Sequence, residues 1–159
     1  MAENGARPSY DKVDRKVEVM DTPYDRWISS QGIDVIRGFF VDNLYTVPLK
    51  WWDRMGGNGV YVMLDGTGYL DDAYVVGIPP GKNLNPQRHI YEALYYVLDG
   101  RGATSVWQNN GPKQSFEWQT GSLFAIPLNA QYQHFNGQGD KEARLLAVTT
   151  PPLVFRLFH

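Results

Sequence analysis

The sequence predicts an all-β fold, an antiparallel barrel or sandwich preceded by a short helix. From residue 60 onward, extended apolar segments recur about every 8 to 12 residues, a spacing typical of sandwiches and barrels. Dipeptides between these segments, such as Asp99-Gly100 and Asn136-Gly137, tolerate the positive φ angles of tight turns. The alternation of strands and helices that marks a parallel nucleotide-binding sheet is missing from the pattern.

The composition suits one compact domain with an appendage. Hydrophobic residues make up 43% of the 159 residues, which is enough for a sizeable core. The net charge of -2 gives no electrostatic reason to expect nucleic-acid binding. Cysteine is absent, which excludes disulfides, thiolate metal sites and a cysteine nucleophile. Without a signal peptide or an apolar run of membrane-spanning length, the chain is expected to be cytoplasmic and to have no membrane partner.

Residues 1–57 are predicted to form an N-terminal arm, a short helix and a leading strand. Residues 1–20 are polar, and we expect a flexible arm there. A helix should begin after Thr22, which can cap it, because Pro23 suits the first helical position and Asp25 suits the first turn. This helix is expected to end near Gly32. A β-like pattern follows over residues 33–49, and residues 51–59 are expected to form a loop.

Residues 58–159 are predicted to form the barrel. The expected strands are residues 60–64, 73–78, 87–89, 93–98, 102–108, 114–118, 122–126, 132–136, 143–149 and 153–157. The last strand lies in an apolar run that reaches Phe158, and isolated domains seldom expose such a run. We expect the run to pack back on the barrel, to pair with another subunit or to continue into more protein. A homodimer is the predicted assembly.

The stretch from residue 87 to residue 98 carries information about both fold and site. In an extended chain one face of it holds Gln87, His89, Tyr91, Ala93, Tyr95 and Val97, and the other holds Leu94, Tyr96 and Leu98. Both faces are largely apolar or aromatic, so the strand is expected to be covered on both sides, with His89 facing an enclosed space. A lone histidine on such a face is also a common hydrogen-bonded core residue.

Two stretches resemble the motifs of the cupin superfamily. The second cupin motif reads Gly-x5-Pro-x-Gly-x2-His-x3-Asn, and its positions are taken here by Gly121, Pro127, Asn129, Tyr132 and Asn136. In the first motif, anchored at Gly100, Gln87 and His89 take the two histidine positions and Ala93 takes the glutamate position. The resemblance implies a cupin-type antiparallel β-barrel, also called a jelly roll or double-stranded β-helix.

The chain looks most like one barrel of a two-barrel, gentisate-dioxygenase-like cupin. In that group the second motif carries a His-x-His pair followed by Asn, which Tyr132, His134 and Asn136 match in spacing. Metal-binding cupins hold iron, manganese, nickel or copper with three histidines and one glutamate. In this chain only His89 keeps the usual ligand type, because alanine, tyrosine and glutamine replace the other three.

A divalent transition metal could still be held by His89, His134 and Gln87, because His134 lies two residues from Tyr132 and shares its face. Tyr132 is the candidate catalytic residue, a proton donor whose pKa a neighbouring cation would have to lower before it could act as a base. Tyr91, Tyr95 and Trp107 could line the site for an aromatic ligand, and Arg88 and Arg101 could bind a carboxylate ligand. Each of these aromatic residues could equally be core packing.

These observations leave three interpretations open. The first is a metal-dependent oxidoreductase of dioxygenase-like ancestry with a degenerate metal site. The second is a metal-free barrel without cofactor that binds a small molecule or supports a catalytic partner barrel. The third is a structural module for dimerisation. Because the cupin fold supports many activities, the motifs do not choose among the three.

Overall fold

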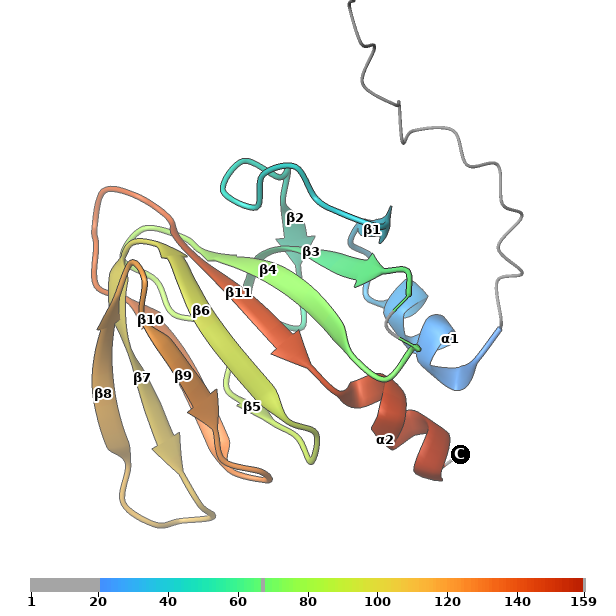
Figure 1. Ribbon diagram of the computed structural model, residues 1–159. Helices are drawn as coiled ribbons and strands as arrows, with labels where there is room; N and C mark the ends of the chain where they lie inside the picture. The colour runs from blue at the N-terminus through green and yellow to red at the C-terminus, as the bar shows by residue number, and fades with distance from the viewer. Residues whose placement is uncertain (1–20, 67, 159) are drawn as a thin grey trace, which may run out of the picture.

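Two β-sheets form the body of the protein, and they lie as two layers in Figure 1. The structure, a computed structural model, describes residues 21–66 and 68–158, so the predicted arm at residues 1–20 lies outside the described residues. Sheet A has the order β1-β3-β4-β11-β6-β9, with β2 also paired to β3, and sheet B has the order β5-β10-β7-β8. The strands are β1 (Val35–Gly38), β2 (Lys50–Trp52), β3 (Gly57–Leu64), β4 (Asp72–Ile78), β5 (Gln87–Arg88), β6 (Ala93–Asp99), β7 (Arg101–Trp107), β8 (Gln114–Gln119), β9 (Leu123–Ile126), β10 (Gln131–Asn136) and β11 (Ala143–Thr149).

Nearly all strand pairs are antiparallel, and the all-β prediction is confirmed; β1 and β3 run parallel. Because β1 and β2 both pair with β3, residues 1–57 contribute strands to the same sheet as the predicted barrel. The described helices are too short to cross a membrane.

Helix α1 (Pro23–Ser30) begins as the sequence predicts. The Thr22 hydroxyl accepts from the Asp25 amide at 3.1 Å, and the Asp25 carboxylate accepts from the Thr22 amide at 3.2 Å, which together form a capping box. Gly32 follows the helix with a φ of 70°. Tyr24 and Ile28 are buried, so one face of α1 is part of the core.

The predicted last strand, residues 153–157, is wrong: the chain forms helix α2 (Pro151–Phe158). Proline has no N–H to donate to a strand ladder, while its fixed φ suits the first turn of a helix, so Pro151 and Pro152 favour the helix. The helix packs back on the domain, where the Phe155 ring meets Tyr24 at a centroid distance of 5.4 Å. Figure 1 shows α1 and α2 beside each other at one end of sheet A.

The loop predicted over residues 51–59 is also wrong in part, because β2 ends at Trp52 and β3 begins at Gly57. The glycines of this stretch serve packing. A Cβ on Gly57 would lie 2.5 Å from Leu84 Cδ2, and one on Gly59 would lie 2.5 Å from Trp52 Cε3. Two glycines thus let large side chains sit directly on the strand backbone.

The two faces of sheet A differ. Its inner face is buried against sheet B and includes Tyr74, Tyr95 and Ala147. Residues 41–49 cover part of the outer face, where Val47 packs on Val60. The rest of the outer face is open: Leu94 is 49% exposed and Tyr96 38%, so the expectation that both faces of this strand are covered is wrong.

Candidate functional site

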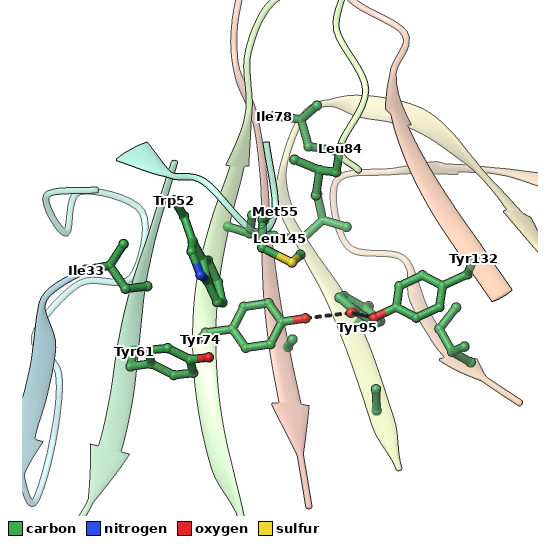
Figure 2. Close-up of a cluster of buried hydrophobic side chains, with 14 of the residues drawn as sticks. Ile33, Trp52, Met55, Tyr61, Tyr74, Ile78, Leu84, Tyr95, Tyr132 and Leu145 are labelled. Carbon is green, nitrogen blue, oxygen red and sulfur yellow. Dashed lines mark hydrogen bonds between the residues drawn. The ribbon is translucent and has the colours of Figure 1, made fainter. Parts of the chain in front are cut away.

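A chain of hydroxyl groups crosses the interior between the two sheets. The hydroxyl oxygens of Tyr74 on β4 and Tyr95 on β6 are 2.6 Å apart, and those of Tyr95 and Tyr132 on β10 are 2.8 Å apart. Figure 2 shows the Tyr74 and Tyr132 side chains reaching Tyr95 from opposite sides. The Tyr132 hydroxyl is also 2.9 Å from His89 Nε2. His89, which is half-buried, connects this chain to the surface.

A backbone carbonyl determines which hydroxyl group donates and which accepts along this series of hydrogen bonds. His89 Nδ1 lies 2.8 Å from the Tyr91 carbonyl oxygen, which can only accept, so Nδ1 carries the proton and Nε2 accepts from Tyr132. Each hydroxyl has one proton, so Tyr95 donates to Tyr132 and Tyr74 donates to Tyr95. Burial lowers the pKa of His89 and raises the pKa of Tyr132, although Tyr95 and Arg54 oppose the rise. The base role that the sequence suggested for Tyr132 would need the opposite shift.

His134 is buried beside the hydroxyl chain. Its Nδ1 is 2.7 Å from the Thr104 hydroxyl, which already accepts from Trp118 Nε1 at 2.9 Å. Since Nδ1 is the one acceptor that the described residues offer to the Thr104 hydroxyl proton, that proton is directed at Nδ1 and the His134 proton lies on Nε2. Within the described part of the chain Nε2 has no hydrogen-bond partner, and the ring meets Tyr95 edge to face at 4.6 Å. Burial lowers the pKa of His134 to about 3.

Arg54 brings a cation to the same interior. The side chain follows β2, and its guanidinium carbon lies 4.8 Å from the centre of the Trp52 ring. Its Nε donates to Gln31 Oε1 at 2.7 Å and its Nη1 to Gln87 Oε1 at 2.6 Å. No aspartate or glutamate of residues 21–66 and 68–158 forms an ion pair with it. The hydroxyl of Tyr61, whose pKa burial raises to about 12 while Arg54 opposes the rise, lies near this charge.

A buried carboxyl group lies on the inner face of sheet A. Strand pairing places Thr149 opposite both Asp72 and Ala93, so the three residues form one row across β4, β11 and β6. Asp72 is 5% exposed, and its Oδ1 accepts a hydrogen bond from the Thr149 hydroxyl. Asp72 Oδ2 is also buried and has no partner among the described residues. The row lies two residues along the strands from Tyr74 and Tyr95, about 7 Å away on the same face.

The donor atoms near His89 do not fit a metal ion. His89 Nε2 is occupied by the Tyr132 hydroxyl, and the Gln87 oxygen is occupied by the cation of Arg54. His134 would have to move its proton from Nε2 before that atom could bind a metal. The ring of Tyr132 lies between the two imidazoles, 5.3 Å from His89 and 5.2 Å from His134. In the described residues no group of three or more His, Asp or Glu side chains is arranged to hold an ion.

The structure brings two of the three predicted ligand-lining residues together. The Tyr91 ring stacks on His89 at a centroid distance of 3.8 Å and is half-buried. Tyr95 is fully buried within the hydroxyl chain. Trp107, however, is on the outer face of β7, because its neighbour Val106 packs against the core. The Lys113 ammonium lies 4.3 Å from the Trp107 ring centre.

Sequence reasoning missed Arg54, Tyr74 and Asp72. Arg54 stands in a stretch that was expected to be a loop, with no feature to mark it as interior. Alternation along residues 73–78 could have placed Tyr74 on one face, and Asp72 precedes that segment on the same parity. Whether this face looks inward depends on how β4 pairs with β11, which lies about seventy residues further along the chain.

A separate cleft of about 600 Å³ lies at the Arg101 end of β7, lined by Arg101, Gly102, Ala103, Glu117, Trp118, Gln119, Ser122, Phe135 and Gly137. Arg101 and Glu117 are exposed and place opposite charges on it. None of the groups around His89 and Arg54 lines this cleft. Its lining includes no buried polar atom that lacks a partner, so nothing in it points to a particular ligand.

One curated protein that is similar in sequence is a dioxygenase. No family model matches the chain. The chain is 31% identical over 75 residues to the 5-aminosalicylate 1,2-dioxygenase of a Comamonas species. The match covers 47% of this chain and 18% of the relative, so the chain spans less than a fifth of that protein's length.

Solved structures with a similar fold are cupins. Oxalate decarboxylase from Lactobacillus farciminis superimposes with a TM-score of 0.56 and 20% identity, over 69% of this chain and 32% of that one. The cupin domain of Cnp3 from Schizosaccharomyces pombe superimposes with a TM-score of 0.55 and 17% identity, over 68% of this chain and 71% of that one. The chain therefore has the cupin fold, as its two motifs predicted. The fold alone does not select a reaction.

Proposed function

We propose that this chain is a cupin barrel that binds a small aromatic carboxylate at Arg54 without a metal ion. The observation that carries the proposal is the half-buried guanidinium of Arg54, which has no carboxylate partner in the described part of the chain. A charge in such a place is normally paired, because withdrawal from water is costly. A carboxylate from a ligand would supply the missing partner.

The surroundings of Arg54 support an aromatic ligand. The guanidinium is held in place by Gln31 and Gln87, which use two of its five N–H donors. The rings of Tyr61 and Tyr74 pack edge to face on Trp52, the ring beside the guanidinium, at centroid distances of 5.0 and 5.2 Å. Rings with a polar tip suit a site that must contact an apolar ring and hydrogen-bond its substituents.

The sequence match agrees with this ligand class. The Comamonas relative is named for 5-aminosalicylate, a benzene ring that carries a carboxylate. The part of that protein that resembles this chain is short, so the ligand class is a proposal for this chain. A dioxygenase reaction would need a metal site, and the hydrogen bonds around His89 and Gln87 favour the metal-free alternative.

Binding should be measured by titration calorimetry with benzoate, salicylate and 5-aminosalicylate, on wild type and on Arg54→Met. Methionine keeps an apolar stem against Trp52 but removes the charge, so we expect at least an approximately tenfold loss of affinity for the carboxylates. Arg26→Met, which removes an exposed arginine on α1, should bind as wild type does. Equal affinity in wild type and Arg54→Met would show that Arg54 does not bind the ligand.

Metal content separates this function from the metal-dependent one. Protein purified without a histidine tag should hold well below one metal ion per chain, and EDTA should leave the affinity for benzoate unchanged. One bound iron, manganese, nickel or copper ion per chain, lost in His89→Ala and in His134→Ala, would instead establish the degenerate metal site.

The open part of the outer face of sheet A supports the predicted homodimer. Strand pairing gathers exposed or half-buried apolar side chains there: Leu94, Tyr96, Leu123, Leu146 and Val148. These residues continue the apolar cluster that residues 41–49 cover. A patch without charged side chains can face its own copy across a two-fold axis without repulsion.

Analytical ultracentrifugation tests the homodimer. Wild type is expected to sediment as a dimer and Leu123→Glu as a monomer, because the new charges would face each other across the axis. Phe158→Glu, which adds the same charge at an exposed position of α2, is the control and should remain dimeric. A monomeric wild type at micromolar concentration would refute the dimer and leave the ligand site untouched.

A further inference from the structure

Asp72 is a buried carboxyl group that the carboxylate site leaves unused. Its side chain is 5% exposed, yet Oδ2 has no hydrogen-bond partner among the described residues. Thr149 occupies only the other oxygen. A buried polar atom without a partner is costly, so it needs an explanation such as a bound group.

The free carboxyl oxygen is on the face of sheet A that looks into the barrel. Asp72, Thr149 and Ala93 are paired across three neighbouring strands, and all three are almost fully buried. Ala93, which stands where the cupin motif has glutamate, leaves little side-chain bulk beside Thr149. The buried carboxyl group in this row comes from β4, two strands away from β6.

Tyr74 and Trp52 connect Asp72 to the Arg54 end of the interior. Tyr74 is two residues from Asp72 on the same face of β4. Its ring centre is 5.2 Å from that of Trp52, and the Trp52 ring centre is 4.8 Å from the guanidinium carbon of Arg54. Among the described residues, the interior thus has a cation without a carboxylate partner beside Trp52 and a carboxyl oxygen without a hydrogen-bond donor two residues from Tyr74.

We infer that the ligand is an amino-carboxylate: Arg54 binds its carboxylate, and Asp72 Oδ2 accepts a hydrogen bond from an amino group at the other end of the ring. The inference rests on the proposed function and adds the second recognition group. A ligand with both groups would give Arg54 a carboxylate and Asp72 Oδ2 a hydrogen-bond donor at once. An isosteric ligand with a methyl group in place of the amino group would leave Asp72 Oδ2 unpaired, and sites built to pair a polar group reject such analogues strongly.

The test compares 4-(aminomethyl)benzoate with 4-methylbenzoate by titration calorimetry at pH 7.5. Wild type is expected to bind the amino compound at least about tenfold more tightly, because a hydrogen bond to a charged group contributes at least this much to the affinity. In Asp72→Asn that ratio should fall to about one, because the amide offers the ligand a donor instead of an acceptor. Asn retains an oxygen for Thr149, and circular dichroism should confirm that the variant is folded. Asp71→Asn removes the same charge at the exposed neighbouring position and should keep the ratio.

The possible failures are distinguishable. If wild type binds both compounds through Arg54 with equal affinity, or if Asp72→Asn keeps the preference for the amino compound, the inference is refuted and the proposed function stands. If neither compound binds to wild type, both are refuted.

Discussion

Asp72 should make the folded state less stable as the pH rises, and Asp72→Asn should remove this dependence. Burial raises the pKa of Asp72 from 3.8 to about 7, against the opposing effect of its hydrogen bond from Thr149. Below pH 3.8 the group is protonated in both the folded and the unfolded chain. Between pH 3.8 and about 7 the unfolded chain releases the proton and the folded chain keeps it, so the free energy of unfolding falls as the pH rises.

The size of the effect follows from this gap between the folded and unfolded pKa. It spans about three pH units at about 1.4 kcal/mol each, which gives a total of about 4 kcal/mol. Asparagine does not titrate. The stability of Asp72→Asn relative to wild type should therefore increase with pH across this window by about 4 kcal/mol, and it should be constant above about pH 7.

In wild type alone the pH dependence of stability that comes from Asp72 would be masked, because the contribution of His134 changes with pH in the opposite direction. Burial lowers the pKa of His134 from 6.5 to about 3, so its contribution to stability is present above pH 6.5 and is lost as the pH falls. Between pH 3.8 and 6.5 the two contributions oppose each other. The difference between variant and wild type isolates Asp72, since His134 is present in both.

Urea unfolding, followed by tryptophan fluorescence at half-unit steps from pH 4 to pH 8, measures this difference. Asp71→Asn, at the exposed neighbouring position, should show no comparable trend. A difference between Asp72→Asn and wild type that stays constant within about 0.5 kcal/mol over the range would mean that water reaches the Asp72 carboxyl, and the reasoning would be refuted.

Three other changes test the packing in chemical-denaturation experiments. Tyr95→Phe removes a hydroxyl that bonds both Tyr74 and Tyr132, and it should lower the free energy of unfolding by about 1–3 kcal/mol; an unchanged value would mean that the hydroxyl chain does not stabilise the fold. Gly59→Ala would place a Cβ 2.5 Å from Trp52 Cε3 and should cost about 1–3 kcal/mol, whereas a gain in stability would show that Trp52 moves freely. Thr22→Ala removes the cap of α1 and should cost about 1 kcal/mol, and a cost near zero would show that the capping box is not formed in solution.

Local sequence patterns predicted most of the secondary structure. The capping residues around Thr22 predict the start of α1. The alternation along residues 131–136 agrees with the burial of Tyr132, His134 and Asn136. Asn129, at a glycine position of the second cupin motif, has a φ of 62°, the conformation that this position requires. These features depend on residues close together in the chain, so the sequence alone is enough to find them.

The helix at residues 151–158 and the strand at residues 57–59 were beyond local patterns. An apolar run such as residues 153–158 fits a strand or a helix, and the choice depends on what it packs against, here Tyr24 of α1. A run rich in glycine is typical of a loop. The contacts that Trp52 and Leu84 make with its backbone are tertiary, so the local sequence does not indicate them.

The sequence by itself determined the cupin fold and the loss of the usual metal ligands at Ala93 and Tyr132, because both are properties of motifs. Only the tertiary structure decided which groups fill the interior. Arg54 and Asp72 come from segments outside the two motifs. The pairing of β4 with β11 sets Asp72 opposite Thr149, and a hydrogen bond to Gln87, thirty-three residues further along the chain, holds Arg54. Pairing of that kind is set by the packing of the whole domain, so no local spacing of residues reports it.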